Sequence, residues 1–139
     1  MSIVSDIRDV AEEVREKCLD FALSDDSIGY DFHGQENLDM MCAVASAVLF
    51  REFCRKGIGK KPRIVEGEYW KEDHCWVEVD DYVVDITASQ FHGPRIVVEP
   101  IEAMRDGGYR GNDKNRLRDW PKEQRPNAKI VRKILSRHR

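Results

Sequence analysis

The chain has 139 residues, of which 41% are hydrophobic and 35% are charged, and its formal net charge at pH 7 is −3. This length suits one domain with its own core, and the composition excludes a disordered or fibrous chain. No apolar run approaches the ~20 residues of a membrane-spanning helix, so no membrane association is expected. The N-terminus carries acid instead of a basic stretch before an apolar one, so no secretory signal is expected, and the expected compartment is the cytoplasm.

Two helices are predicted in the N-terminal part of the chain. Apolar residues recur every three or four positions over 3–21, with charged residues between them. A second helix is predicted over 39–56, with an apolar stripe so wide that the helix should run through the core. We expect Asn37 or Asp39 to cap this helix, which places Cys42 in its first turn.

Strands are predicted to follow the helices. Runs rich in β-branched and aromatic residues lie at 62–67, 74–79, 82–86 and 95–98. Asp80 and Asp81 form a predicted two-residue hairpin turn between the second and third strands. Residues 105–127 are rich in Gly, Asn, Asp, Arg and Pro and are predicted as loop, whereas 128–135 could form a short strand or a helix. This order predicts a single α+β domain over 1–139, with N-terminal helices packed on a small antiparallel sheet.

Basic residues concentrate at the C-terminal end of the chain. Residues 122–139 contain seven Lys and Arg against one Glu, whereas the stretch 12–36 is mostly acidic. Such a tail can bind nucleic acid or an acidic partner, but a solvated face that complements the acidic stretch is the favoured interpretation. No aromatic residue follows Trp120, so the tail offers no platform for stacking bases, and nucleic acid is not the expected partner.

Cys42, His74 and Asp85 are the candidate catalytic residues. A helix N-terminus presents unpaired N–H groups and a partial positive charge, which favour the thiolate of Cys42 and could also stabilise an oxyanion. His74 opens one predicted strand and Asp85 lies near the end of the next. If Val79 pairs with Tyr82 across the turn, His74 and Asp85 are diagonal neighbours, roughly 7–8 Å apart at the backbone and within side-chain reach.

Each of these residues also has a structural explanation, as a buried thiol, a surface imidazole and a turn carboxylate. Their order and placement together favour catalysis, with Cys42 as nucleophile, His74 as base and Asp85 orienting the base. Cys75 is expected to point to the opposite face of the strand, outside the site, and Trp76 to pack beneath it. The four cysteines are expected to be free thiols, and no C-x-x-C pair suggests a zinc site.

Residues 37–91 resemble the core of the transglutaminase-like, papain-fold cysteine enzymes. The matching pieces are Cys42-Ala43 at the start of a helix, Gly57-Ile58, Val65-x-Gly67, His74-x-Trp76-Val77-Glu78-Val79 and Asp85-x-Thr87. The chain is similar in particular to small bacterial members, including the proteases that cut leader peptides from lasso-peptide precursors. This resemblance implies a papain-like/transglutaminase-like fold and a Cys42–His74–Asp85 triad. It also implies action on a peptide or protein amide through a thioester, without a metal or an organic cofactor.

Several alternatives stay open at this stage. The resemblance does not separate protease, deamidase and transglutaminase. Gln35 and Asn37 are candidates for the second oxyanion donor, because a side-chain amide just upstream of the cysteine has this role in papain-like enzymes, although loop polarity and helix capping explain both. The alternative function is a non-catalytic protein- or nucleic-acid-binding module that retains the fold. A zinc hydrolase that uses His74, Cys75 and a remote histidine is weaker, since the ligand spacing is missing.

Overall fold

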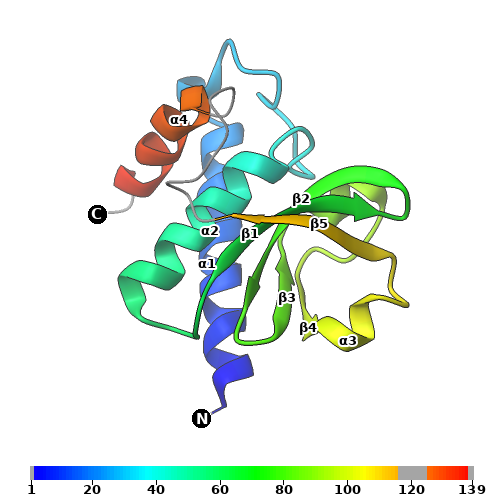
Figure 1. Ribbon diagram of the computed structural model, residues 1–139. Helices are drawn as coiled ribbons and strands as arrows, with labels where there is room; N and C mark the ends of the chain where they lie inside the picture. The colour runs from blue at the N-terminus through cyan, green and yellow to red at the C-terminus, as the bar shows by residue number, and fades with distance from the viewer. Residues whose placement is uncertain (1, 116–124, 138–139) are drawn as a thin grey trace.

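The computed structural model describes residues 2–115 and 125–137 and has the expected α+β architecture (Figure 1). The helices are α1 (Ile3–Ala22), α2 (Cys42–Lys56), α3 (Ile101–Met104) and α4 (Arg125–Ser136), with 3-10 turns η1 (Asp25–Ser27) and η2 (Ala88–Phe91). The strands are β1 (Arg63–Tyr69), β2 (Glu72–Val79), β3 (Tyr82–Asp85), β4 (Val97–Pro100) and β5 (Tyr109–Asn115). They form one antiparallel sheet in the order β4-β3-β2-β1-β5.

The two predicted helices are present, and the second lies in the interior. Ser2 caps α1 by accepting a hydrogen bond from the Ser5 N–H at 3.2 Å. Helix α2 packs against α1, α4 and β2, which explains why apolar and small residues occupy most of its sides (Figure 1). Gly57 ends α2 in the left-handed conformation at φ 65°, which glycine adopts without strain.

The predicted cap of α2 is wrong. The helix begins at Cys42, its N-cap is Met41, and no side chain of the described residues caps it. Asn37 Oδ1 instead accepts from the Asp39 N–H at 3.1 Å, and Asp39 Oδ1 accepts from the Met40 N–H at 3.1 Å, so both side chains shape the preceding loop. The first-turn N–H groups of α2, beginning at Cys42, therefore lack both helical acceptors and a capping side chain.

The hairpin between β2 and β3 has the predicted register. Val79 pairs with Tyr82, and Asp80 and Asp81 have φ values of 52° and 66°, as a two-residue turn of type I′ requires. The fourth strand, β4, begins at Val97, two residues later than predicted, and continues to Pro100. The hairpin register decides which side chains share a face of the sheet, and hence what His74 meets.

Strand β5 contradicts the prediction of loop over 105–127. It adds to the free edge of β1, where Gly67 pairs with Gly111, and it buries Tyr109. Long-range pairing with β1 outweighs the poor strand propensity of this Gly-rich stretch, which local patterns do not reveal. Residues 116–124 of the same prediction lie outside the described residues. The segment 128–135 belongs to helix α4, not to a strand.

A separate core covers each face of the sheet. On one face, apolar residues of β1, β2 and β3 pack under α1, α2 and α4. On the other face a smaller, more aromatic core contains Tyr69, Trp76 and Tyr109. Successive residues of β2 alternate between the two, so that Val77 faces the helices and Trp76 faces the aromatic core. His74 shares the aromatic face with Trp76.

The described part of α4 packs its charges against the acidic N-terminal region. Arg137 pairs with Asp26 at 2.5 Å, and Lys133 lies over the ring of Tyr30 at 5.8 Å. These contacts agree with the interpretation of the basic tail as a complement to the acidic stretch. Residues 122–124 and 138–139 of that tail lie outside the described residues. Within the described ranges, no helix has the length and apolarity needed to cross a membrane.

Gly67→Ala is predicted to destabilise the fold by about 1–3 kcal/mol, because its Cβ would meet the Arg110 carbonyl oxygen at 2.0 Å and push β5 away from β1. Gly111→Ala is the matched control, since its Cβ would meet a methyl group of Val65 at 2.8 Å instead of backbone. Urea denaturation gives the free energy of unfolding of each variant. Equal decreases in the free energy of unfolding of the two variants would show that the close backbone contact of Gly67 is unimportant.

Candidate active site

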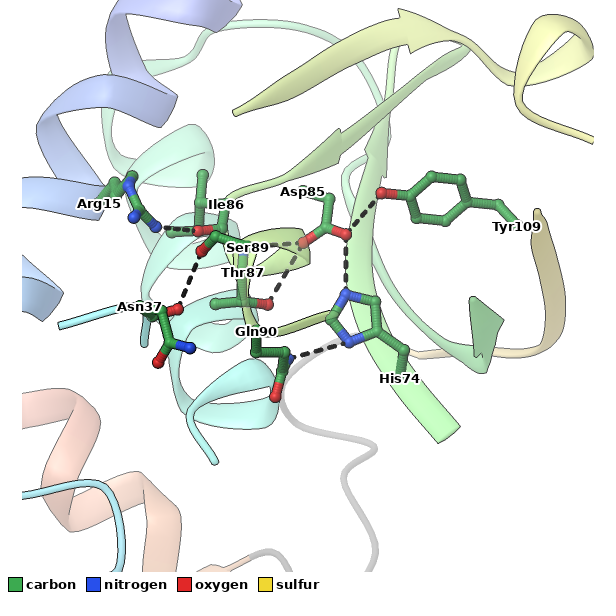
Figure 2. A network of polar contacts seen from close by, with 9 residues as sticks. All are labelled: Arg15, Asn37, His74, Asp85, Ile86, Thr87, Ser89, Gln90 and Tyr109. Carbon is green, nitrogen blue, oxygen red and sulfur yellow. Dashed lines mark hydrogen bonds and ion pairs between the residues drawn. The ribbon is translucent and has the colours of Figure 1, made fainter. Parts of the chain in front are cut away.

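His74 and Asp85 form a buried pair at the centre of the candidate site (Figure 2). His74 Nε2 lies 2.7 Å from Asp85 Oδ2, and the His74 and Asp85 side chains are 0% and 1% exposed. The contact follows from the hairpin register, which brings β2 and the end of β3 together as predicted from the sequence. Since Nε2 is held by Asp85, Nδ1 is the nitrogen that remains for chemistry.

Asp85 is held in place by three further hydrogen bonds. Tyr109 Oη donates to Asp85 Oδ2 at 2.6 Å, and Asp85 Oδ1 accepts from the Thr87 N–H at 2.9 Å and from Thr87 Oγ1 at 3.3 Å (Figure 2). Burial and the charge of Asp85 raise the pKa of Tyr109 well above its ordinary value, so Tyr109 stays a neutral donor. These bonds satisfy a carboxyl group that would otherwise be costly to bury.

The segment after Asp85 is fixed to α1 by a buried arginine. Arg15 Nη1 donates to the Ile86 carbonyl oxygen at 2.6 Å, and Arg15 is 4% exposed. Burial lowers the pKa of Arg15, with a further contribution from the positive charge of Arg95. This contact anchors the backbone next to Asp85, so the carboxyl group is positioned from both its side chain and its main chain.

Aromatic rings enclose the imidazole of His74. Phe91 meets it edge-on, with centroids 5.1 Å apart and an interplanar angle of 83°, and Tyr69 and Trp76 lie at 5.9 and 6.0 Å. Trp76 is 1% exposed and lies in the core, as predicted. The rings exclude water from His74, which strengthens its electrostatic interactions with Asp85 and with other charged neighbours.

Cys42 lies where the edge of β2 is open. Strand β3 pairs with β2 only as far as Val77, so the backbone of Cys75 has no partner from β3. The Cys75 backbone makes a small contribution to a lower pKa of Cys42. His74 and the Cys75 thiol both act on Cys42 and lower its pKa. His74 and Cys75 thus approach Cys42 from opposite faces of one strand. Cys42 is only half-buried.

The expectation that Cys75 lies outside the site is therefore wrong. Alternation along β2 does place Cys75 on the helix-facing side, away from His74. That side is where the N-terminus of α2 packs, so the Cys75 thiol meets Cys42 there. The hydrogen bond to Cys42, with burial, raises the pKa of Cys75 well above its ordinary value. Cys75 thus remains a thiol that donates to Cys42.

These contacts make Cys42 acidic. The largest cause is the interaction with the Cys75 thiol, which lowers the pKa of Cys42. Burial raises this pKa, but the interaction with His74 and its charge lower it further. The pKa of Cys42 therefore falls to about 5. Burial alone would lower the pKa of His74, but the hydrogen bonds and charges of Asp85 and Cys42 outweigh it and raise that pKa to about 9. At a pH between these two pKa values, Cys42 and His74 form a thiolate–imidazolium pair. By contrast, burial raises the pKa of Cys18 to about 12.

The two residues predicted as oxyanion donors show different environments. Asn37 Oδ1 accepts a hydrogen bond from the Asp39 N–H. The Asn37 carbonyl oxygen accepts from Ser89 Oγ at 2.9 Å (Figure 2). Asn37 therefore has a structural role in its loop. Gln35 is half-buried, and its backbone N–H donates to Phe32, with no side-chain hydrogen bond to another described residue. Within the described part of the chain, neither side chain forms a hydrogen bond with His74 or Asp85.

Sequence reasoning missed two further residues at the site, Gln90 and Tyr109. Gln90 Nε2 lies 3.4 Å from His74 Nδ1. A polar residue five positions after Asp85 was a usable signal for Gln90. Tyr109 could not be found in this way, because its segment was predicted as loop and only the pairing of β5 with β1 brings it to Asp85.

Comparison of the chain with models of protein families, with curated proteins and with solved structures finds no match. No group of three His, Cys, Asp or Glu side chains among the described residues is placed to hold a metal ion. What the site can do is therefore inferred from its own geometry and from the resemblance in the sequence.

Cys75→Ala is predicted to raise the pKa of Cys42, because it removes the thiol whose hydrogen bond contributes most to the low value. The rate of iodoacetamide labelling at Cys42, located by mass spectrometry, should have its midpoint near pH 5 in the wild-type chain and at a higher pH in the variant. Cys18→Ala is the control, since Cys18 is fully buried elsewhere in the core. An unchanged midpoint in Cys75→Ala would contradict the role of Cys75.

Proposed function

We propose that this chain is a cysteine-dependent acyl-transfer enzyme that acts on a peptide or protein amide, with Cys42, His74 and Asp85 as its triad. The observation that carries the proposal is the buried His74–Asp85 pair, at 2.7 Å, together with a half-buried thiol at a helix N-terminus that interacts with His74. A purely structural thiol does not need an imidazolium partner and a low pKa. The papain-like/transglutaminase-like fold suggested by the sequence is part of the same proposal.

The first half of the reaction forms a thioester. The Cys42 thiolate attacks the carbonyl carbon of the amide, and the electron pair of the C=O bond moves to oxygen. The uncapped N–H groups at the start of α2 are suited to stabilise this oxyanion. As the C–N bond breaks, His74 gives its Nδ1 proton to the leaving amine. Asp85 holds the Nε2 proton throughout and keeps the ring in the correct orientation.

The second half transfers the acyl group to an acceptor. Neutral His74 takes a proton from water or from an amine, the acceptor attacks the thioester carbon, and Cys42 leaves as a thiolate. Water gives hydrolysis of a peptide bond or deamidation of a side chain, and an amine gives a new amide. Turnover requires the thiolate and the imidazolium at once, so it should rise with pH through about 5 and fall through about 9.

Cys42→Ala is predicted to abolish turnover while the fold survives, because it removes the attacking sulfur and replaces a half-buried side chain with one that α2 accommodates. A complex peptide mixture is incubated with the wild-type chain or with the variant and read by mass spectrometry. New termini, deamidated side chains or amine adducts, each absent with Cys42→Ala, identify hydrolysis, deamidation and transfer. Cys54→Ala, at an exposed position, is the matched control. Identical products with Cys42→Ala and the wild-type chain would refute the proposal.

A further inference from the structure

Gln90 places a carboxamide beside Nδ1 of His74. Its Nε2 lies 3.4 Å from His74 Nδ1, while Asp85 occupies Nε2 of the same ring (Figure 2). Since Asp85 holds Nε2, Nδ1 is also the nitrogen that is left for the interaction of His74 with Cys42. Gln90 is half-buried.

The turn that carries Gln90 is held rigidly on both sides. Asp85 accepts from the N–H of Thr87, the residue before η2, and the Gln90 N–H donates to the Thr87 carbonyl oxygen at 3.1 Å. Ser89 Oγ donates to the Asn37 carbonyl oxygen at 2.9 Å and so joins η2 to the loop that precedes Cys42. The turn is thus fixed to both halves of the site, which is the preorganisation that an oxyanion donor needs.

Among the described residues, the Gln90 amide has only a weak partner. At 3.4 Å, the contact between Gln90 Nε2 and His74 Nδ1 is a long and therefore weak hydrogen bond. The Gln90 N–H groups are therefore available to an acceptor that arrives with the substrate.

We propose that Gln90 is a catalytic residue that donates an N–H group to the oxyanion formed when Cys42 attacks a carbonyl carbon. The other donors are the uncapped N–H groups at the start of α2. This inference rests on the proposed acyl-transfer function and replaces Gln35 and Asn37 as the side-chain donor. Asn37 is less suited, because its amide oxygen is already used within its own loop.

Two probes separate a donor to the oxyanion from a residue that acts on the thiol. p-Nitrophenyl acetate is attacked by Cys42 at its carbonyl carbon, passes through an oxyanion and expels p-nitrophenolate, which leaves an acetyl thioester. Iodoacetamide alkylates the same sulfur by displacement of iodide and forms no oxyanion. The first rate is followed by release of p-nitrophenolate, with the signal of Cys42→Ala subtracted, and the second by mass spectrometry of the Cys42 peptide.

Gln90→Ala is predicted to slow acetylation of Cys42 about 100-fold, the size of effect seen when one oxyanion donor is lost, and to leave the alkylation rate unchanged from pH 4 to 8. Gln35→Ala is the matched control, because it removes the same amide from the loop before Cys42, and both rates should stay at the wild-type level. The unchanged alkylation profile of Gln90→Ala also shows that the variant is folded with its ion pair intact.

Three results would overturn the inference. Unchanged acetylation in Gln90→Ala excludes Gln90 as a donor. Slower acetylation of Cys42 in Gln35→Ala, instead of in Gln90→Ala, assigns the oxyanion donor to the loop before Cys42. A parallel fall of acetylation and alkylation in Gln90→Ala shows that Gln90 acts on the thiol or on His74. Failure of the proposed function looks different, because Cys42 of the wild-type chain would then react slowly with both probes at pH 7.

Discussion

The buried contact between His74 and Asp85 is the interaction on which the rest of the site depends. It joins β2 to the end of β3, fixes the orientation of the imidazole and supplies the negative charge that keeps His74 protonated. Much of the surrounding structure serves this contact. Tyr109 and Thr87 saturate the carboxyl group, Arg15 anchors the next carbonyl, and aromatic rings exclude water. An Asp left without these donors would be too costly to bury.

The position of Cys42 follows from two local features of the fold. Helix α2 begins at this residue without a capping side chain, and β3 leaves β2 just before the level of Cys75, which opens the edge of the strand. The sulfur fits between a helix N-terminus and a strand edge, which both present N–H groups. The reactive form of the thiol is therefore stabilised by backbone as well as by His74 and Cys75.

The sequence was sufficient to predict what depends on local patterns. Helical periodicity predicted α1 and α2, and strand composition with a two-residue turn predicted the β2–β3 hairpin, so the contact of His74 with Asp85 followed from counting along two strands. What depends on long-range packing was missed. The pairing of β5 with β1 brings Tyr109 to the site, and the packing of α2 on β2 brings Cys75 to Cys42. The cap of α2 was wrong because Asn37 and Asp39 bond within their own loop.

The protonation state of His74 at neutral pH tests the central claim most directly. Selective 15N labelling of histidine, with His74→Asn to assign the signal, reports by NMR the charge of this ring between pH 5 and 10. The thiolate–imidazolium pair predicts a cation at pH 7 that loses its proton near pH 9, and a lower midpoint in Cys42→Ala, where the thiolate charge is absent. A His74 that is neutral at pH 7, with the same midpoint in both chains, would contradict the ion pair and the mechanism built on it.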